Sequence, residues 1–385
     1  MTVTGPSAAH ADGDEAWLCS AVTGLSLGRV PLATDRQVLQ TVDAARRASL
    51  DWAAVPAVDK HLAVHRVIEQ VTLRQPEIAR LLAEEVGVSV TPLPSLSPGF
   101  AVPESRAKAG VCGVVVTWND PLAGTTDLIV PLLLAGRSCV VVVAPEIALS
   151  GLLLGEAVRA AGLPDGLVTV LPGGAAAVDA LLGSAVEHVI ANGYAVVSAL
   201  PSALLSEDAP LDGFLAALPW LCLAGNGQYG RDRTRVLVPR KRFGEIVDAV
   251  TDTVAALAVG DPRDPDVAIG PVLDDWHVEA LESAVAQAWR AGARITLGGT
   301  RDRTWDDGCF LEPTVVADPD PLGPVAQPPV PGPLVALLPY DGGLDGAQQL
   351  ARRAGFCIDS VWTGGSTFNQ SHARKSVAGT TARSA

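Results

Sequence analysis

The sequence predicts an α/β fold in which a parallel sheet of the nucleotide-binding type is followed by a second α/β domain. Short runs of β-branched residues alternate with helix-length segments along the chain. Because these runs are apolar on both faces, they are typical of parallel strands that helices cover on either side. A chain of 385 residues is also long enough for two domains of ordinary size.

In the first half, apolar residues at helical spacing predict successive amphipathic helices over residues 35–86, with breaks at Pro56 and Pro76. The residues before them are weakly periodic, so we expect a loose or extended arm. Residues 91–110, rich in Pro and Ser, are expected to be a surface connection. Four strands of right-handed βαβ units should follow: VCGVVVTW from Val111, SCVVVVA from Ser138, GLVTVL from Gly166 and HVIA from His188.

A second α/β series begins after Pro219 and includes the strands RTRVLV, RITLGG, FLEPTVVA and PLVALLPYD. Helices are expected over 243–257 and 278–291. We therefore predict an N-terminal arm over residues 1–34, a nucleotide-binding-like domain over 35–215 and a catalytic-like α/β domain over 216–363. A polar C-terminal tail should occupy residues 364–385.

Composition excludes several classes of function. The formal net charge of −14 opposes nucleic-acid binding, which needs clustered Lys and Arg. The most apolar stretch is interrupted by Pro131 and Arg137, which excludes a membrane span, and the N-terminus lacks the pattern of a signal peptide. Six scattered cysteines without CxxC spacing indicate reduced thiols in a cytoplasmic protein. The excess of Arg over Lys indicates a bacterial source with a GC-rich genome.

The segment GDPRDPDVAIGPVLDD, from Gly260, resembles the aldehyde dehydrogenase superfamily. Further matches stand around it in the family's order: TWNDP, AGLPDGLVTVLPGG, GNGQYGRDRTRVLVP, GCFLEPTV and SVWT. Several motifs in order over residues 35–381 are far more specific than one short match. The resemblance implies an aldehyde dehydrogenase-like fold, shortened between Gly87 and Arg106 in a region that shapes the family's oligomer contacts.

The family oxidises aldehydes through a cysteine thiolate, and this resemblance places Gly230 at the nucleophile's position. Cys222 is the nearest thiol. It lies in the apolar run LPWLCLAG, which favours a buried structural cysteine over a displaced nucleophile. Asn119 in TWNDP matches the family's oxyanion-binding asparagine. It is either a remnant of that function or a turn residue ahead of Pro121.

The other parts of the family's site are not found either. The resemblance puts Val196 or Val197 at the position of the base glutamate and Ala144 at that of the ribose-binding lysine. The Gly-rich turn expected after Ile190 is missing. Pro328 and Pro329 stand where the nicotinamide-ribose glutamate should be, while the glycines of that motif and those after the third strand remain as fold features. We therefore expect no bound cofactor.

Two further groups are weaker candidates. His61 and His65, four residues apart on a helix, could share a metal ion, but no third ligand is placed, which favours a solvated or partly packed helix face. Arg231, Asp232, Arg233 and Arg235 could bind an anion or form an ion-paired loop. The sequence therefore predicts no metal site.

From these residues we expect a pseudoenzyme with an aldehyde dehydrogenase fold that serves as an interaction partner or ligand-binding subunit. Its partner would be an active paralogue of the family or a second copy of the chain. The alternative is an oxidoreductase that acts on an aldehyde or thioester and holds NAD or NADP in a rearranged site.

Overall fold

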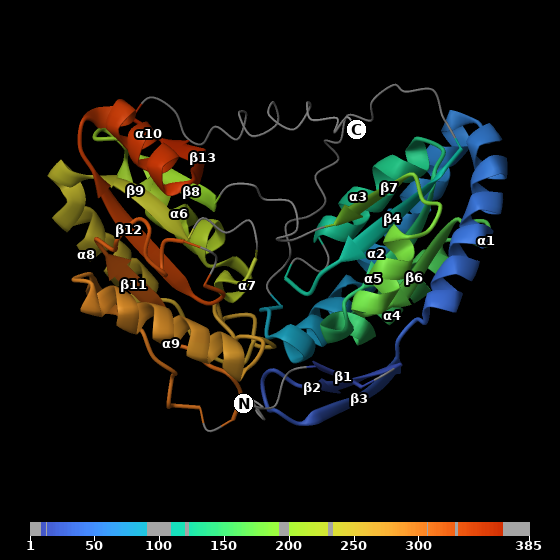
Figure 1. Ribbon diagram of the computed structural model, residues 1–385, viewed down its shortest axis with the longest axis horizontal. Helices are drawn as coiled ribbons and strands as arrows, with labels where there is room; N and C mark the ends of the chain where they lie inside the picture. The colour runs from blue at the N-terminus through green and yellow to red at the C-terminus, as the bar shows by residue number, and fades with distance from the viewer. Residues whose placement is uncertain are drawn as a thin grey trace. The chain divides into compact units, whose positions relative to one another are not determined.

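The computed structural model describes residues 9–12, 14–90, 109–119, 123–191, 200–229, 234–305, 307–327 and 330–364 (Figure 1). They form two compact units. The first comprises the described residues within 1–196, 258–276 and 303–310, and the second those within 197–257, 277–302 and 311–385. The sequence-based division at residue 215 does not foresee that 258–276 and 303–310 pack with the first unit, because tertiary contacts alone decide this.

The first unit is built on a parallel sheet, as the valine runs predicted. Its four strands lie in the order β6-β5-β4-β7, and every neighbouring pair is parallel. They are β4 (Val111–Val116), β5 (Ser138–Val143), β6 (Val168–Pro172) and β7 (His188–Ala191). All residues of β5 are buried, so this strand lies in the centre of the core.

Helices cover both faces of this sheet. On one face, α1 (Asp35–Ala54) and α5 (Ala175–Leu182) pack on valines of β4 and β5. On the other face, α2 (Ala57–Val86) packs against α4 (Ala148–Ala160) and α3 (Ala123–Leu134). Fully burying one such valine contributes roughly 1.5–3 kcal/mol. The fold class predicted from the sequence is confirmed.

The N-terminal residues form a small sheet instead of a loose arm. Strands β1 (Ala9–Asp12), β2 (Glu15–Cys19) and β3 (Ser26–Pro31) are antiparallel in the order β1-β2-β3. Ala16 and Leu18 of β2 are buried, whereas the alternating residues Glu15 and Trp17 are exposed. This two-residue alternation is short, which is why the strand is hard to predict from the sequence.

Pro76 does not break the helix, and the expected break there is wrong. Helix α2 runs through Pro76, because Ile78 and Leu82 beyond it are buried and continue the packed face. A proline removes the hydrogen bond to the carbonyl four residues earlier, which belongs to Thr72. Thr72 and Pro76 are both exposed, so water can satisfy that carbonyl. The break at Pro56 is confirmed.

The second unit has a six-stranded sheet in the order β10-β11-β12-β9-β8-β13. All neighbouring pairs are parallel except the pair β10 and β11. The strands are β8 (Leu200–Leu205), β9 (Arg235–Pro239), β10 (Arg294–Leu297), β11 (Thr314–Ala317), β12 (Leu334–Tyr340) and β13 (Phe356–Trp362). The second α/β domain is thereby confirmed as a fold.

The helices of this unit are α6 (Leu211–Cys222), α7 (Ala224–Gly227), α8 (Phe243–Ala255), α9 (Asp275–Arg290) and α10 (Gly343–Ala354). Short 3₁₀ turns precede α4 (Pro145–Ile147) and α8 (Arg240–Arg242). Phe214 of α6 meets Trp362 of β13 edge to face, with ring centroids 5.6 Å apart. Over the described residues, no helix combines the length and the apolar character needed to cross a bilayer.

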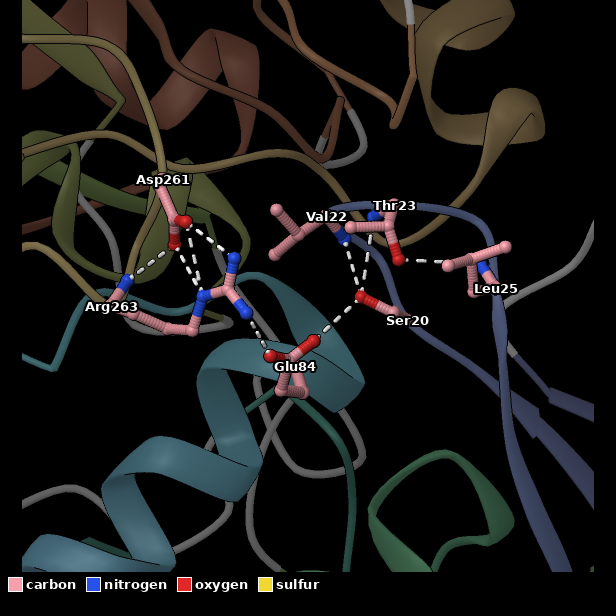
Figure 2. Close-up of polar contacts among 7 residues, drawn as sticks. All are labelled: Ser20, Val22, Thr23, Leu25, Glu84, Asp261 and Arg263. Atoms are coloured by element: carbon pink, nitrogen blue, oxygen red, sulfur yellow. Dashed lines mark hydrogen bonds and ion pairs between the residues drawn. The ribbon is translucent and has the colours of Figure 1, made fainter.

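An ion-paired cluster fastens the returning segment 258–276 within the first unit. Figure 2 shows Arg263 between Asp261 and Glu84 of α2, and its Nη1 lies 2.6 Å from Glu84 Oε1. Ser20 donates to the other oxygen of Glu84 at 2.7 Å, so the turn after β2 joins the cluster. The guanidinium of Arg263 lowers the pKa of Asp261 by hydrogen bonding to its carboxylate.

A close backbone approach holds the same segment. Gly87 ends α2 with φ of 72°, and a Cβ there would collide with the carbonyl of Pro271. A Cβ on Gly270 would in turn collide with the carbonyl of Gly87. Only glycine permits this packing at both positions.

Glu85, one residue after Glu84 on α2, is fully buried at the start of α4. Its carboxylate accepts the backbone N–H groups of Leu149, at 2.7 Å, and Ser150, and also the hydroxyl of Ser150. These N–H groups have no partner within the helix, so Glu85 caps α4. Burial nevertheless raises the pKa of Glu85 to about 7, because desolvation outweighs these hydrogen bonds.

The pKa of Glu85 predicts a pH dependence of stability. A carboxyl whose pKa is higher in the folded chain than in the unfolded chain stabilises the fold at low pH. That contribution is lost as the pH rises from about 4.5 through about 7. Between pH 5 and 8, the wild-type free energy of unfolding in urea should fall by up to about 3 kcal/mol more than that of Glu85→Gln. Equal pH slopes in the two proteins would contradict this origin.

The Arg263 cluster predicts a local effect on the returning segment. Replacing Arg263 with Met removes both ion pairs and should speed amide hydrogen exchange in residues 258–269, at a cost of about 1 kcal/mol in stability. Arg74→Met is the matched control, because Arg74 pairs with Glu77 on an exposed face of one helix. Unchanged exchange in residues 258–269 of Arg263→Met would rule out this role of the cluster.

Candidate functional site

In the first unit, the sequence-predicted residues lie where parallel strands end. Asn119 follows β4 in a turn and is 4% exposed. Its Oδ1 accepts a hydrogen bond of 2.5 Å from the hydroxyl of Thr117. This bond occupies the carbonyl end of the amide and orients the Nδ2 donor group away from Thr117. Thr117 is a positioning residue that sequence reasoning missed, although its place two residues before Asn119 is a signal for such a bond.

Ala144 directly follows β5, at the position where the resemblance to the family puts a ribose-binding lysine. Its methyl group offers neither charge nor a hydrogen-bond donor, and the half-buried Glu146 follows it in a 3₁₀ turn. The next helix, α4, has its second and third N–H groups bound by Glu85. The start of this helix is therefore occupied by a carboxylate of the chain itself. Val196, Val197 and the segment after Ala191 lie outside the described residues.

In the second unit, the nucleophile loop begins with a left-handed turn. Gly225, Asn226 and Gly227 have φ values of 55°, 62° and 68°. Asn226 is the one non-glycine in this run and is 1% exposed; asparagine tolerates the left-handed region better than most residues. An asparagine between two glycines is typical of such a turn, so the sequence Gly-Asn-Gly was a signal for it.

Gly227 fits closely against Gly332. A Cβ on Gly227 would collide with the carbonyl oxygen of Gly332, whose own N–H donates back to Gly227 O at 3.3 Å. Gly332 has φ of 152°, and a Cβ there would meet the side chain of Leu281. Both glycines are thus required by packing, whatever chemistry the loop performs.

Arg235, at the start of β9, is 2% exposed and holds the chain just before Pro328 and Pro329. Its Nε donates to Ala326 O at 2.6 Å and its Nη2 donates to Gln327 O. The next two residues, Pro328 and Pro329, lie outside the described residues, as do Arg231, Asp232 and Arg233. Arg235 is thus a buried anchor, which the sequence did not distinguish from its charged neighbours.

Cys222 lies at the last position of α6 and has no exposed surface. Gly230, at the nucleophile's expected position, is outside the described residues. Asn119 belongs to the first unit, whereas Cys222 belongs to the second.

All six cysteines fall in the described part of the chain. Burial raises the pKa of Cys112 and of Cys139, which are neighbours on β4 and β5. Cys309 is buried, Cys19 is partly exposed, and Cys357 on β13 is exposed.

The sequence matches the model of one protein family over most of its length. The sequence model described as the Aldehyde dehydrogenase family matches residues 9–95, 93–198 and 198–380. Geranial dehydrogenase from Castellaniella defragrans is 27% identical over 398 residues, which cover 90% of this chain and 82% of that protein. An NAD⁺-dependent benzaldehyde dehydrogenase from Pseudomonas putida is 26% identical over 365 residues, which cover 82% of this chain and 73% of that protein.

Solved structures agree with the sequence comparison. The NAD⁺ complex of an aldehyde dehydrogenase from Mycobacterium tuberculosis superposes with a TM-score of 0.78 and 27% identity, covering 92% of this chain and 83% of that one. The NAD⁺ complex of an aldehyde dehydrogenase from Bacillus cereus gives a TM-score of 0.79 at 21% identity, covering 90% and 80%. The second likeness concerns the fold alone.

The burial of the cysteines predicts an order of alkylation. In the native protein, iodoacetamide should modify Cys357 first and leave Cys222, Cys112 and Cys139 unmodified until the chain unfolds, because a buried thiol neither meets the reagent nor ionises readily. Peptide mass spectrometry after timed labelling measures this order. Rapid native labelling of Cys222 would contradict its buried position, and labelling in urea controls for reagent activity.

Proposed function

Because the chain belongs to the aldehyde dehydrogenase family, we propose that it keeps the family's fold without the thiol-dependent reaction and serves as an interaction partner or ligand-binding subunit. One observation carries this proposal. The nucleophile's position holds Gly230, and the nearest thiol in sequence, that of Cys222, is fully buried. Function resides in sites and not in folds, so loss of the site is compatible with the retained sheets.

The chemistry explains why this loss matters. Oxidation by the family's route begins when a thiolate adds to the aldehyde carbon, and hydride transfer to the nicotinamide follows from that adduct. Glycine has no side chain, so no adduct can form at residue 230. Cys222 would have to leave the core to react. The amide of Asn119 could still donate a hydrogen bond to an oxyanion, but without a nucleophile no oxyanion forms.

Residues for the cofactor support the same proposal. Ala144 replaces a cation, the start of α4 is capped by Glu85, and prolines 328 and 329 replace the acidic positions of the nicotinamide-ribose motif. A dinucleotide would therefore find no lysine at residue 144 to hold its ribose, and Glu85 occupies two N–H groups at the start of α4.

An oxidoreductase with a rearranged site is the second candidate. Its support comes from the relatives, which are named as dehydrogenases of geranial and benzaldehyde, and from solved relatives named as NAD⁺ complexes. Retention of Asn119 beside Thr117 also favours it. In that case NAD or NADP would be held without the family's ribose-binding lysine, Gly-rich turn and nicotinamide-ribose glutamate.

Aldehyde-dependent formation of NADH separates the two candidates. With NAD⁺ or NADP⁺ and geranial, benzaldehyde or vanillin, the purified chain should give no absorbance increase above the enzyme-free blank. Calorimetric titration should find no saturable micromolar binding of either dinucleotide. Activity that survives Cys222→Ala would reveal a nucleophile other than those considered, and activity lost in Cys222→Ala would identify Cys222 as displaced but functional. Either result would overturn the proposal.

The partner role has its own test. The chain, carrying an affinity tag and produced in its native host, should co-purify with an intact aldehyde dehydrogenase or with an untagged copy of itself. Light scattering then gives the stoichiometry of the complex. Recovery of the tagged chain as a lone monomer at physiological concentration would contradict a role as a subunit.

A further inference from the structure

Two histidines share an exposed face of α2. His61 and His65 are one helical turn apart, and both side chains are exposed. Side chains at this spacing are neighbours on a helix surface, and two histidines four residues apart on one helix face can bind a single metal ion. The sequence alone left this pair without a decisive feature.

The structure adds the orientation of the first ring. His61 Nδ1 lies 2.7 Å from the carbonyl oxygen of Ala57, one turn earlier on the same helix. A carbonyl can only accept, so Nδ1 carries the proton and Nε2 keeps its lone pair. A hydrogen bond from one ring nitrogen to a carbonyl is the arrangement that fixes the tautomer and orientation of metal-binding histidines. His65 makes no hydrogen bond or ion pair with another described residue.

The charges around the pair favour a cation. The nearest positive groups in sequence, Lys60 and Arg66, are directed elsewhere. Lys60 Nζ donates to Ala53 O at 3.1 Å, and Arg66 Nε donates to Ala161 O at 3.1 Å. Glu69 is exposed one turn after His65 and adds negative charge to the same region of the helix. Among the described residues there is no group of three or more His, Cys, Asp or Glu arranged to hold a metal ion. The pair would therefore supply two ligands, and water would complete the coordination.

We propose that His61 and His65 form a surface site for a late first-row divalent cation, of which Ni²⁺, Cu²⁺ and Zn²⁺ suit imidazole ligands. Binding requires the two rings at helical spacing, so the cation binds the folded helix in preference to the unfolded chain. It consequently stabilises the first unit by an amount that grows with the logarithm of the free cation concentration once the site is occupied.

The test uses Ni²⁺ alone and the full chain. Calorimetric titration should detect one Ni²⁺ per chain. His61→Gln and His65→Gln should each weaken binding at least tenfold, since one imidazole is a poorer ligand than two. Glutamine suits an exposed helix position, so both variants should fold normally by circular dichroism. Saturating Ni²⁺ should raise the urea midpoint of the wild type and leave that of the two variants unchanged.

Two controls make the result specific. Asp59→His with His61→Gln keeps the number of histidines but places them about 120° apart around the helix axis, so it should bind as weakly as the single variants. His188→Gln removes an exposed histidine on β7 and should bind like the wild type. The proposal would be overturned if the rearranged variant bound Ni²⁺ as tightly as the wild type. Loss of Ni²⁺ binding in His188→Gln would also overturn it.

Discussion

Strands β4 and β5 carry valines on both faces, and neither face can meet water without cost. A parallel strand of this kind needs a helix layer on each side, and the chain supplies α1 and α5 for one face and α2, α3 and α4 for the other. The positions of the other groups in the first unit follow from that layering. Glu85 reaches the start of α4 because α2 lies against α4, and Asn119 stands at the strand ends because β4 must turn there.

Close packing requires glycine at several positions of this chain. Gly87, Gly227 and Gly332 each stand where a Cβ would collide with a neighbouring carbonyl or side chain. Replacing any of them would disturb the fold itself.

The four strands of the first parallel sheet and β9 to β12 of the second could be predicted from local sequence, because hydrophobic periodicity and β-branched runs report burial directly. Strands β8 and β13 were not among the predicted strands. The prediction at Pro76 was wrong because it weighed one lost hydrogen bond and not the burial of Ile78 and Leu82 beyond it. The small sheet of β1 to β3 was missed because its alternation spans few residues. Family membership was predicted from ordered motifs and is confirmed by the comparisons.

The candidate site was harder to predict, because its geometry depends on contacts between distant parts of the chain. The bond from Thr117 to Asn119 is local and could have been anticipated. The anchoring of Ala326 and Gln327 by Arg235 could not, since 91 residues separate Arg235 from Ala326 and no pattern in either segment points to the other. Capping of α4 by Glu85, 64 residues before Leu149, is equally non-local.

The return of residues 258–276 and 303–310 to the first unit has a practical consequence for anyone who wishes to dissect the gene. No single cut yields two self-sufficient fragments, since a polypeptide that ends before residue 258 lacks the segment 258–276, which packs at the end of α2. The later fragment would contain this segment but not the helix against which it packs. The chain passes between the two units five times, so unfolding of one unit should disturb the other, and the chain would unfold as one cooperative entity in spite of having two cores.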